Sequence, residues 1–135
     1  MNPDPRLLRV FAQRYTEAWC SMDPSRVAMH FAPEGSLAIN GGAPAVGRSA
    51  ITEVARSFYT ALPDMQVYLR DVVADGDHIE YHWTFTGTNI GPGGTGNAVR
   101  VDGFEAWVLD ENGLIASSRG QYDAAEYARQ LAHGV

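Results

Sequence analysis

The chain has 135 residues, of which 45% are hydrophobic and 19% are charged, and its formal net charge is −6. This length and composition predict a single folded domain over residues 1–135 and exclude a disordered chain. Because the net charge is negative and no run of Lys or Arg occurs, we expect no nucleic acid partner.

A lone cysteine and scattered histidines narrow the remaining classes of site. Cys20 has no partner for an internal disulfide, and we interpret it as a small buried residue of the first helix. His30, His78 and His133 lack metal-ligand spacing, so the sequence predicts no metal site. The first six residues carry no signal-peptide pattern and no apolar run reaches membrane length, so we expect a cytoplasmic protein without a membrane segment.

Three helices are predicted in the first half of the chain. An Asp-Pro pair, which combines a cap with a first helical turn, begins a helix over residues 4–21 and a short helix over residues 23–31. A brief strand over residues 36–39 precedes a third helix over residues 48–61, which Pro63 ends. Apolar positions at helical spacing predict a buried stripe on the first helix, made of Leu8, Phe11, Tyr15, Ala18, Trp19 and Met22.

Strands make up most of the second half. Four runs, over residues 65–74, 78–86, 99–109 and 114–122, are separated by turns rich in Gly, Asp and Asn. A short helix follows from Asp123, where Asp-Ala-Ala-Glu has the spacing of a capping box. Helices followed by strands favour an α+β fold, in which the helices pack on one face of a curved antiparallel sheet.

Two of these strands place polar residues among apolar ones at alternate positions. The strand over residues 78–86 has an apolar face of Ile79, Tyr81, Trp83 and Phe85 and a polar face of Glu80, His82, Thr84 and Thr86. One face of the strand over residues 99–109 holds Val101, Gly103, Glu105 and Trp107. We assign His82 and Glu105 to the same, inward side of the sheet.

Several short segments resemble landmarks of a known superfamily, in the right order along nearly the whole chain. They are Tyr15-Thr16-Glu17-Ala18-Trp19, Leu62-Pro63-Asp64-Met65, Thr86-Gly87-Thr88-Asn89-Ile90-Gly91, Thr95-Gly96, Asn112-Gly113-Leu114-Ile115, Tyr122-Asp123 and Gln130-Leu131. The chain resembles the nuclear transport factor 2-like superfamily, and most of all its SnoaL-like polyketide cyclase branch. The resemblance implies a cone-shaped α+β barrel, in which N-terminal helices cover the curved sheet over a mostly apolar cavity. This fold serves enzymes and binding domains alike, so it implies little about chemistry.

The resemblance also implies roles by position. Tyr15 matches the tyrosine that donates a hydrogen bond to the oxyanion in ketosteroid isomerase, and Glu105 matches the protonated aspartic acid of that enzyme. Asn40 falls where its general base would be, and Gly120 falls where the cyclases carry an acid. An amide cannot abstract a proton, so steroid isomerisation by that mechanism is not expected.

Glu105 and His82 are the main catalytic candidates. A carboxyl group between Gly103 and Trp107 in an apolar cavity would have a raised pKa and could donate a hydrogen bond or accept a proton. The alternative for Glu105 is an ion pair with an arginine on an exposed face. An imidazole inside the cavity suits acid/base work, whereas the alternative for His82 is a half-buried residue bonded to a neighbouring strand.

Tyr15 and Asp123 complete the set of catalytic candidates. Tyr15 lies one helical turn from Phe11 and Trp19, so that packing explains it as well as function does. Asp123 also has a structural role as a helix N-cap. We expect the substrate to contact Trp19, Asn40, Phe58 and Trp107.

Two classes of function stay open. The first is a cyclase, isomerase or dehydratase that acts on a hydrophobic carbonyl compound by acid/base chemistry without a cofactor. The second is a binding or accessory domain that holds a small hydrophobic ligand without turning it over. Tyr15, His82 and Glu105 favour the enzyme, whereas Asn40 and Gly120 favour the binding domain.

A homodimer is expected as well. If His82 faces the cavity, Tyr81, Trp83 and Phe85 face outward from the sheet. These aromatic side chains would form a patch that is large for the surface of a monomer. Two copies packed back to back through the outer faces of their sheets would cover it.

Overall fold

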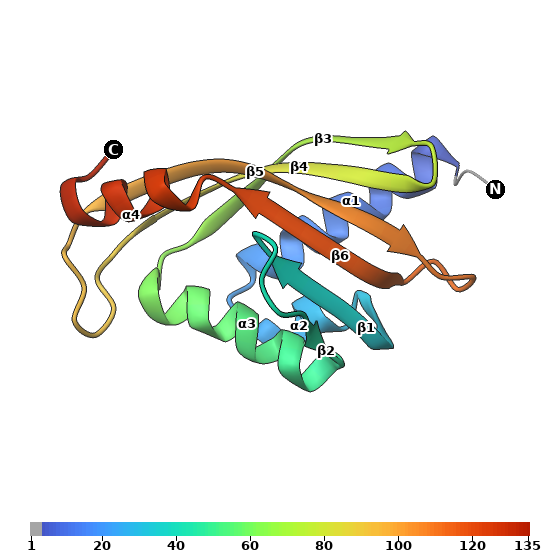
Figure 1. The fold of residues 1–135 in the computed structure, drawn as a ribbon, viewed down its shortest axis with the longest axis horizontal. Helices are drawn as coiled ribbons and strands as arrows, with labels where there is room; N and C mark the ends of the chain where they lie inside the picture. The colour runs from blue at the N-terminus through green and yellow to red at the C-terminus, as the bar shows by residue number, and fades with distance from the viewer. Residues whose placement is uncertain (1–3) are drawn as a thin grey trace.

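The structure, a computed structural model, describes residues 4–135 and has four helices and six strands there (Figure 1). In chain order these elements are α1 (Pro5–Cys20), α2 (Pro24–Ala28), β1 (Phe31–Ile39), β2 (Ala45–Val46), α3 (Arg48–Ala61), β3 (Gln66–Asp75), β4 (His78–Thr88), β5 (Ala98–Leu109), β6 (Ile115–Tyr122) and α4 (Ala124–His133). Residues 1–3, part of the segment in which the sequence predicts no signal peptide, lie outside the described residues. Within residues 4–135, no helix combines the length and apolar character that crossing a membrane requires. The predicted α+β order is confirmed.

Carboxylate caps begin three of the helices at the predicted places. Asp4 accepts a hydrogen bond from the backbone N–H of Arg6 at 2.8 Å, and a bond of the same kind begins α2. Asp123 caps α4 by accepting from the N–H of Glu126 at 2.9 Å. These starts could be predicted because a cap and the first turn of a helix are local in sequence.

Phe31 belongs to a strand and not, as predicted, to the end of the second helix. α2 already ends at Ala28, and Phe31 pairs with Ile115 of β6. Both paired side chains are fully buried. A short apolar run fits a buried helix and a buried strand equally well, so pairing with a distant segment decides the outcome. β1 is therefore longer than the strand predicted over residues 36–39.

The six strands form one curved open sheet in the order β2-β1-β6-β5-β4-β3. β3, β4, β5 and β6 pair antiparallel along the chain, as predicted, whereas β1 lies parallel to β6. In Figure 1, α1 crosses behind the central strands and α3 lies below them. Helices and sheet enclose a space in which Trp19 of α1 and Phe58 of α3 meet side chains of β4.

The apolar face of β4 points inward, and its polar face points outward. The inward side chains, all less than a tenth exposed, are Ile79, Tyr81, Trp83 and Phe85. Glu105 pairs with Tyr81 and shares this inner face, while His82 pairs with Phe104 on the opposite face. Burying one large apolar side chain stabilises a fold by roughly 2 kcal/mol, whereas polar side chains can stay in water. The assignment of His82 to the cavity is therefore wrong, and that of Glu105 is correct.

The aromatic patch behind the homodimer prediction lies inside the molecule. The outer face of β4 and β5 carries polar side chains, among them Glu80, His82 and Asp102, next to Phe104. The exposed aromatic patch therefore no longer supports a homodimer, which stays a prediction.

Candidate active site

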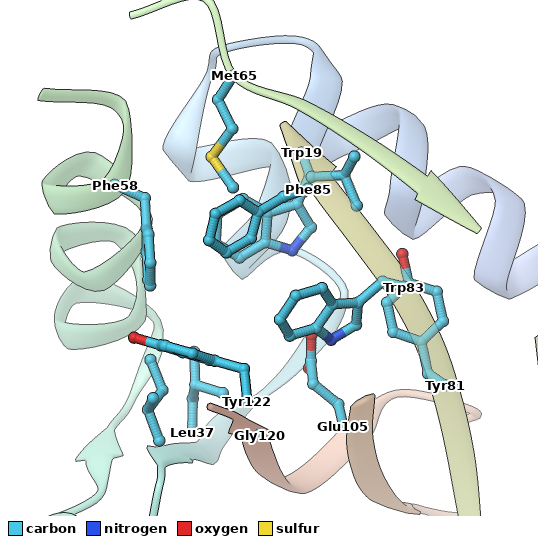
Figure 2. Close-up of a pocket in the computed structure, with 12 residues that line it drawn as sticks. Trp19, Leu37, Phe58, Met65, Tyr81, Trp83, Phe85, Glu105, Gly120 and Tyr122 are labelled. Atoms are coloured by element: carbon cyan, nitrogen blue, oxygen red, sulfur yellow. The ribbon is translucent and has the colours of Figure 1, made fainter. Parts of the chain in front are cut away.

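A cavity of about 50 Å³ lies between α1, α3 and the inner face of the sheet (Figure 2). Much of its wall is aromatic, formed by Trp19, Phe58, Trp83, Phe85 and Tyr122. Glu105 supplies the one carboxyl group among the described residues that line the cavity. On this measure about 10–15 Å³ holds one water molecule, so the space has room for a few waters or a small chemical group.

Glu105 is held by donors from three different elements. Its Oε1 atom accepts hydrogen bonds from the Tyr15 hydroxyl of α1 at 3.0 Å, from Trp107 Nε1 of β5 at 3.1 Å and from Ser118 Oγ of β6 at 2.7 Å. Oε2 lies 3.2 Å from the Tyr15 hydroxyl and has no other hydrogen bond within residues 4–135. Only 7% of Glu105 is exposed, so burial and these hydrogen bonds fix its carboxyl group. Oε1 has its full set of hydrogen bonds, whereas Oε2 can still bind a further partner.

Burial decides the protonation of this carboxyl group. Desolvation raises the pKa of Glu105, and the hydrogen bonds from Ser118, Trp107 and Tyr15 lower it by less. Burial also raises the pKa of Tyr15 well above its usual value, and the nearby charge of Glu105 adds to this. Tyr15 therefore stays a donor. When Glu105 is neutral, its proton belongs on Oε2, because three donors already occupy Oε1.

Four of the predicted site residues lie around Glu105, but in two different ways. Trp19 and Phe58 line the cavity, and their contact with a substrate stays a prediction. Tyr15 and Trp107 are fully buried behind Glu105 and donate to it, and neither is part of the cavity wall. Their side chains therefore position the carboxyl group and do not touch a molecule in the cavity.

His82 lies on the outer face of the sheet, away from the cavity. Its Nε2 atom is 3.1 Å from Oε1 of Glu80, and Oε2 of Glu80 is 3.2 Å from Nε2 of His78. These contacts raise the pKa of His78 and lower that of Glu80. The predicted role of His82 in cavity chemistry does not fit this position, because the sheet separates it from Glu105.

His78 and Glu80 also lie close to Asp75, and the three form a group of potential metal ligands that the spacing in the sequence does not suggest. Asp75, His78 and Glu80 each place one potential ligand atom within 4.8 Å of the others. Asp75 comes from the end of β3 and pairs with His78 across the hairpin. Ligand spacing along the sequence could not show this cluster, because strand pairing creates it.

The side chains of Asn40 and Asp123 accept hydrogen bonds from backbone N–H groups. Asn40 is exposed, adopts a φ of 51° in the turn after β1, and accepts a hydrogen bond on Oδ1 from the N–H of Tyr122 at 2.9 Å. Asp123 is the exposed cap of α4. Neither residue lines the cavity. The substrate contact predicted for Asn40 and the catalytic role predicted for Asp123 do not fit these positions.

Sequence reasoning missed two groups of residues at the site. Ser118, which is 1% exposed and makes the shortest bond to Glu105, lies two residues before Gly120 and therefore on the same strand face. That shared face was the signal that could have identified it. The other group is the inward aromatic face of β4, which the alternation predicts as a face but which was placed outward.

A family model supports the resemblance seen in the sequence. The model described as SnoaL-like polyketide cyclase matches residues 9–131, which is most of the chain. No curated protein gives a significant match to the chain.

Solved structures with the same fold cover nearly the whole chain. A protein from Jannaschia sp. CCS1, described as a SnoaL-like polyketide cyclase, has a TM-score of 0.82 at 14% identity, over 100% of this chain and 98% of its own. AclR from Streptomyces galilaeus, described as a hydroxylase, has a TM-score of 0.79 at 18% identity, over 95% of this chain and 97% of its own. A protein with a ketosteroid isomerase-like fold from Catenulispora acidiphila DSM 44928, in complex with trimethylamine, has a TM-score of 0.79 at 18% identity, over 90% of this chain and 91% of its own. At these identities the likeness shows the fold.

Proposed function

The chain belongs to the SnoaL-like polyketide cyclase family, and on this basis we propose that it is a small-molecule enzyme that acts on a hydrophobic carbonyl compound by acid/base chemistry without a cofactor. The observation that carries the proposal is the buried carboxyl group of Glu105 in an otherwise apolar and aromatic cavity. A carboxylic acid with a raised pKa can be present in its neutral form near pH 7 and act as a proton donor.

In the proposed reaction, Glu105 donates its proton from Oε2 to the carbonyl oxygen of the substrate. This makes the carbonyl carbon more electrophilic and the neighbouring C–H more acidic, which enolisation, ring closure and dehydration all require. The carboxylate that results keeps the hydrogen bonds from Tyr15, Trp107 and Ser118 on Oε1. It can then take back a proton that the substrate releases.

The cavity wall favours a flat, unsaturated substrate. Trp83 is stacked on Phe85, with ring centroids 5.5 Å apart, and Trp19 meets Phe58 edge to face at 6.1 Å. Aromatic walls of this kind bind conjugated rings through offset stacking and edge contacts. A conjugated polyketide has both the carbonyl groups and the flat shape that this wall suits.

The alternative proposal is a domain that binds a ligand without turning it over. It is favoured by Gly120, which lines the cavity at the position where the cyclases resembled by this chain carry an acid. A Cβ atom at Gly120 would meet nothing closer than 3.7 Å, so that a side chain would fit next to Glu105. If an acid has been lost here, Gly120→Asp should introduce turnover that the parent chain lacks.

The experiment that tests the proposed enzyme measures exchange of α-protons. Ketones and 1,3-diketones are incubated with the protein in D₂O, and the exchange of their α-protons is followed by NMR. In a separate binding screen, small amines are added because the Catenulispora neighbour holds trimethylamine. For a ketone that exchanges, Glu105→Gln should slow the reaction by a factor of about 100 or more. Glu111→Gln, which makes the same chemical change on an exposed residue, is the matched control. Equal rates for parent and Glu105→Gln would refute the proposed role, and tight binding of ketones without exchange or conversion would favour the binding domain.

Two predictions from the sequence go with this proposal. We expect a homodimer, for which the outer face offers Tyr68 and Val108 at 52% and 44% exposure, and a location in the cytoplasm. A monomer mass in light scattering at micromolar concentration would remove the homodimer.

A further inference from the structure

The indole N–H group of Trp83 is a buried donor without a partner. Among the buried side-chain nitrogen and oxygen atoms of residues 4–135, it alone lacks a hydrogen bond, and Trp83 is 8% exposed. Buried indole N–H groups nearly always have a partner, because an unpaired one destabilises the fold. Two neighbouring polar groups are paired, since Trp107 donates to Glu105 and the hydroxyl of Tyr81 bonds to that of Thr16. A buried donor without a partner in the cavity wall points to a missing ligand atom.

The ring of Trp83 is held from three sides. It stacks on Phe85 with an interplanar angle of 18°, and Tyr122 meets its edge with ring centroids 6.2 Å apart. On the third side, a Cβ atom at Gly103 would lie 2.5 Å from Cη2 of the ring. The ring therefore rests directly on the backbone of β5, and glycine is required beneath it. Its N–H group is fixed in the wall and does not rotate to reach solvent.

Trp83 and Glu105 are neighbours in the cavity wall. Trp83 pairs with Gly103, two residues before Glu105 on β5, so the two side chains are diagonal neighbours on the inner face. Both line the cavity, and Figure 2 shows the nitrogen edge of the indole on the side of the ring toward Glu105. The carboxyl group of Glu105, with its open atom Oε2, belongs to the same cavity wall. One end of the cavity thus combines an N–H donor with a carboxyl group.

We propose that Trp83 Nε1 and Glu105 Oε2 form a single oxygen-binding site, which takes the carbonyl oxygen of a ketone and the enol or enolate oxygen formed from it. The inference rests on the proposed function in one respect, namely that Glu105 holds a proton. Both partners then donate, so the site accepts an oxygen acceptor and rejects an ammonium group, which has only donors to offer. Two fixed donors aimed at one oxygen stabilise the charge that develops there during enolisation. This assigns to Trp83 a direct contact with the reacting oxygen.

Ligand entry and pairing of the indole are coupled. Nε1 is closed off from solvent. A ligand oxygen therefore reaches it only as the wall moves, and the N–H group gains its missing partner in the same step.

The test follows the indole N–H resonances of the ¹⁵N-labelled parent protein while cyclopentanone is added. The resonance of Trp83 is assigned through its contacts with Gly103, without the need for a variant. We expect it to move downfield as the ketone binds, because its proton becomes hydrogen-bonded, while Trp19 and Trp107 move less. Trp83→Phe, which keeps an aromatic ring and removes the N–H group, should weaken binding about fivefold to tenfold, as expected for one hydrogen bond. Pyrrolidine, a cation of the same ring size at neutral pH, should bind weakly or not at all.

Three outcomes would overturn the oxygen-binding site. They are a Trp83 resonance that stays in place at saturation with cyclopentanone, unchanged affinity in a folded Trp83→Phe variant, and binding of pyrrolidine in preference to the ketone. The proposed function fails separately. If the resonance moves as expected while Glu105→Gln retains the parent's rate of α-proton exchange, the site is supported and the catalytic role of Glu105 is refuted.

Discussion

Replacing Glu105 with glutamine should make the protein more stable at neutral pH than the parent chain. The amide keeps an oxygen that can accept the hydrogen bonds from Tyr15, Trp107 and Ser118, so the local packing is retained. It cannot ionise, whereas the parent must bury a negative charge once Glu105 loses its proton. Burial raises the pKa of Glu105, which means that this ionisation is less favourable in the folded protein than in water.

The sign and the size of the effect follow from proton linkage. Since the folded-state pKa of Glu105 lies above its usual value of 4.5, the stability linked to its neutral form is fully present below pH 4.5. That stability is lost as the pH rises through the folded-state pKa. The difference in free energy of unfolding between the glutamine variant and the parent should therefore grow by up to about 1.4 kcal/mol per pH unit above pH 4.5, and then level off.

Urea unfolding at intervals between pH 4 and pH 8 measures this difference, with both proteins followed by tryptophan fluorescence. Glu111→Gln, on an exposed residue, reports the effect of removing one negative charge from the whole chain and is subtracted. A glutamine variant that is less stable than the parent at pH 7, by more than it is at pH 4, would refute the reasoning.

Three further substitutions test other parts of the structure. Ser118→Ala removes the 2.7 Å hydrogen bond to the buried carboxyl group of Glu105 and should lower the free energy of unfolding by about 1–3 kcal/mol. The loss should be larger at neutral pH than at pH 4, and equal losses at both pH values would contradict the prediction. Gly103→Ala places a methyl group against the ring of Trp83 and should lower the free energy of unfolding by about 1–3 kcal/mol. It should also shift the tryptophan emission, and an unchanged spectrum would contradict the packing of the ring on Gly103. On the outer face, the contact with Glu80 raises the pKa of His78 above 6.5, so its stabilisation is present below pH 6.5 and is lost as the pH rises through the folded-state pKa. The same contact lowers the pKa of Glu80 below 4.5, so its share is present above pH 4.5 and is lost in acid. His78→Ala should therefore destabilise most between about pH 5 and 6, and a loss that is independent of pH in urea unfolding would remove the pair as a source of stability.

Elements with local signals could be predicted from the sequence, and the inner and outer faces could not. The cap of α4 at Asp123 and the strict alternation of β4 follow from residues that are neighbours in the chain. Which face of β4 turns inward depends on helices far away in sequence, and the aromatic side chains outweigh the polar ones because their burial contributes more. A functional role for His82 favours the inward orientation, but the burial of Ile79, Tyr81, Trp83 and Phe85 outweighs it.

The candidate site shows the same division. Parity along β5 correctly placed Glu105 on the same face as Gly103, since strand alternation is a local property. The donors that fix its carboxyl group come from α1 and β6, and Tyr15 lies 90 residues away in the chain. A hydrogen bond over such a separation is set by the packing of whole elements. The sequence could therefore indicate the acid and the strand face of Ser118, but not the hydrogen bond that joins them.

Direct titration of the Glu105 side chain tests the central claim, that burial in the cavity raises the pKa of this carboxylic acid above its usual value. The carboxyl carbon of Glu105 can be followed by ¹³C NMR between pH 3 and pH 9, with its resonance assigned by its absence from the spectrum of Glu105→Gln. We predict a midpoint clearly above 4.5, because desolvation outweighs the hydrogen bonds that favour the charged form. A midpoint at or below 4.5 would mean that Glu105 is an ordinary carboxylate at neutral pH, and would contradict its proposed role as a proton donor.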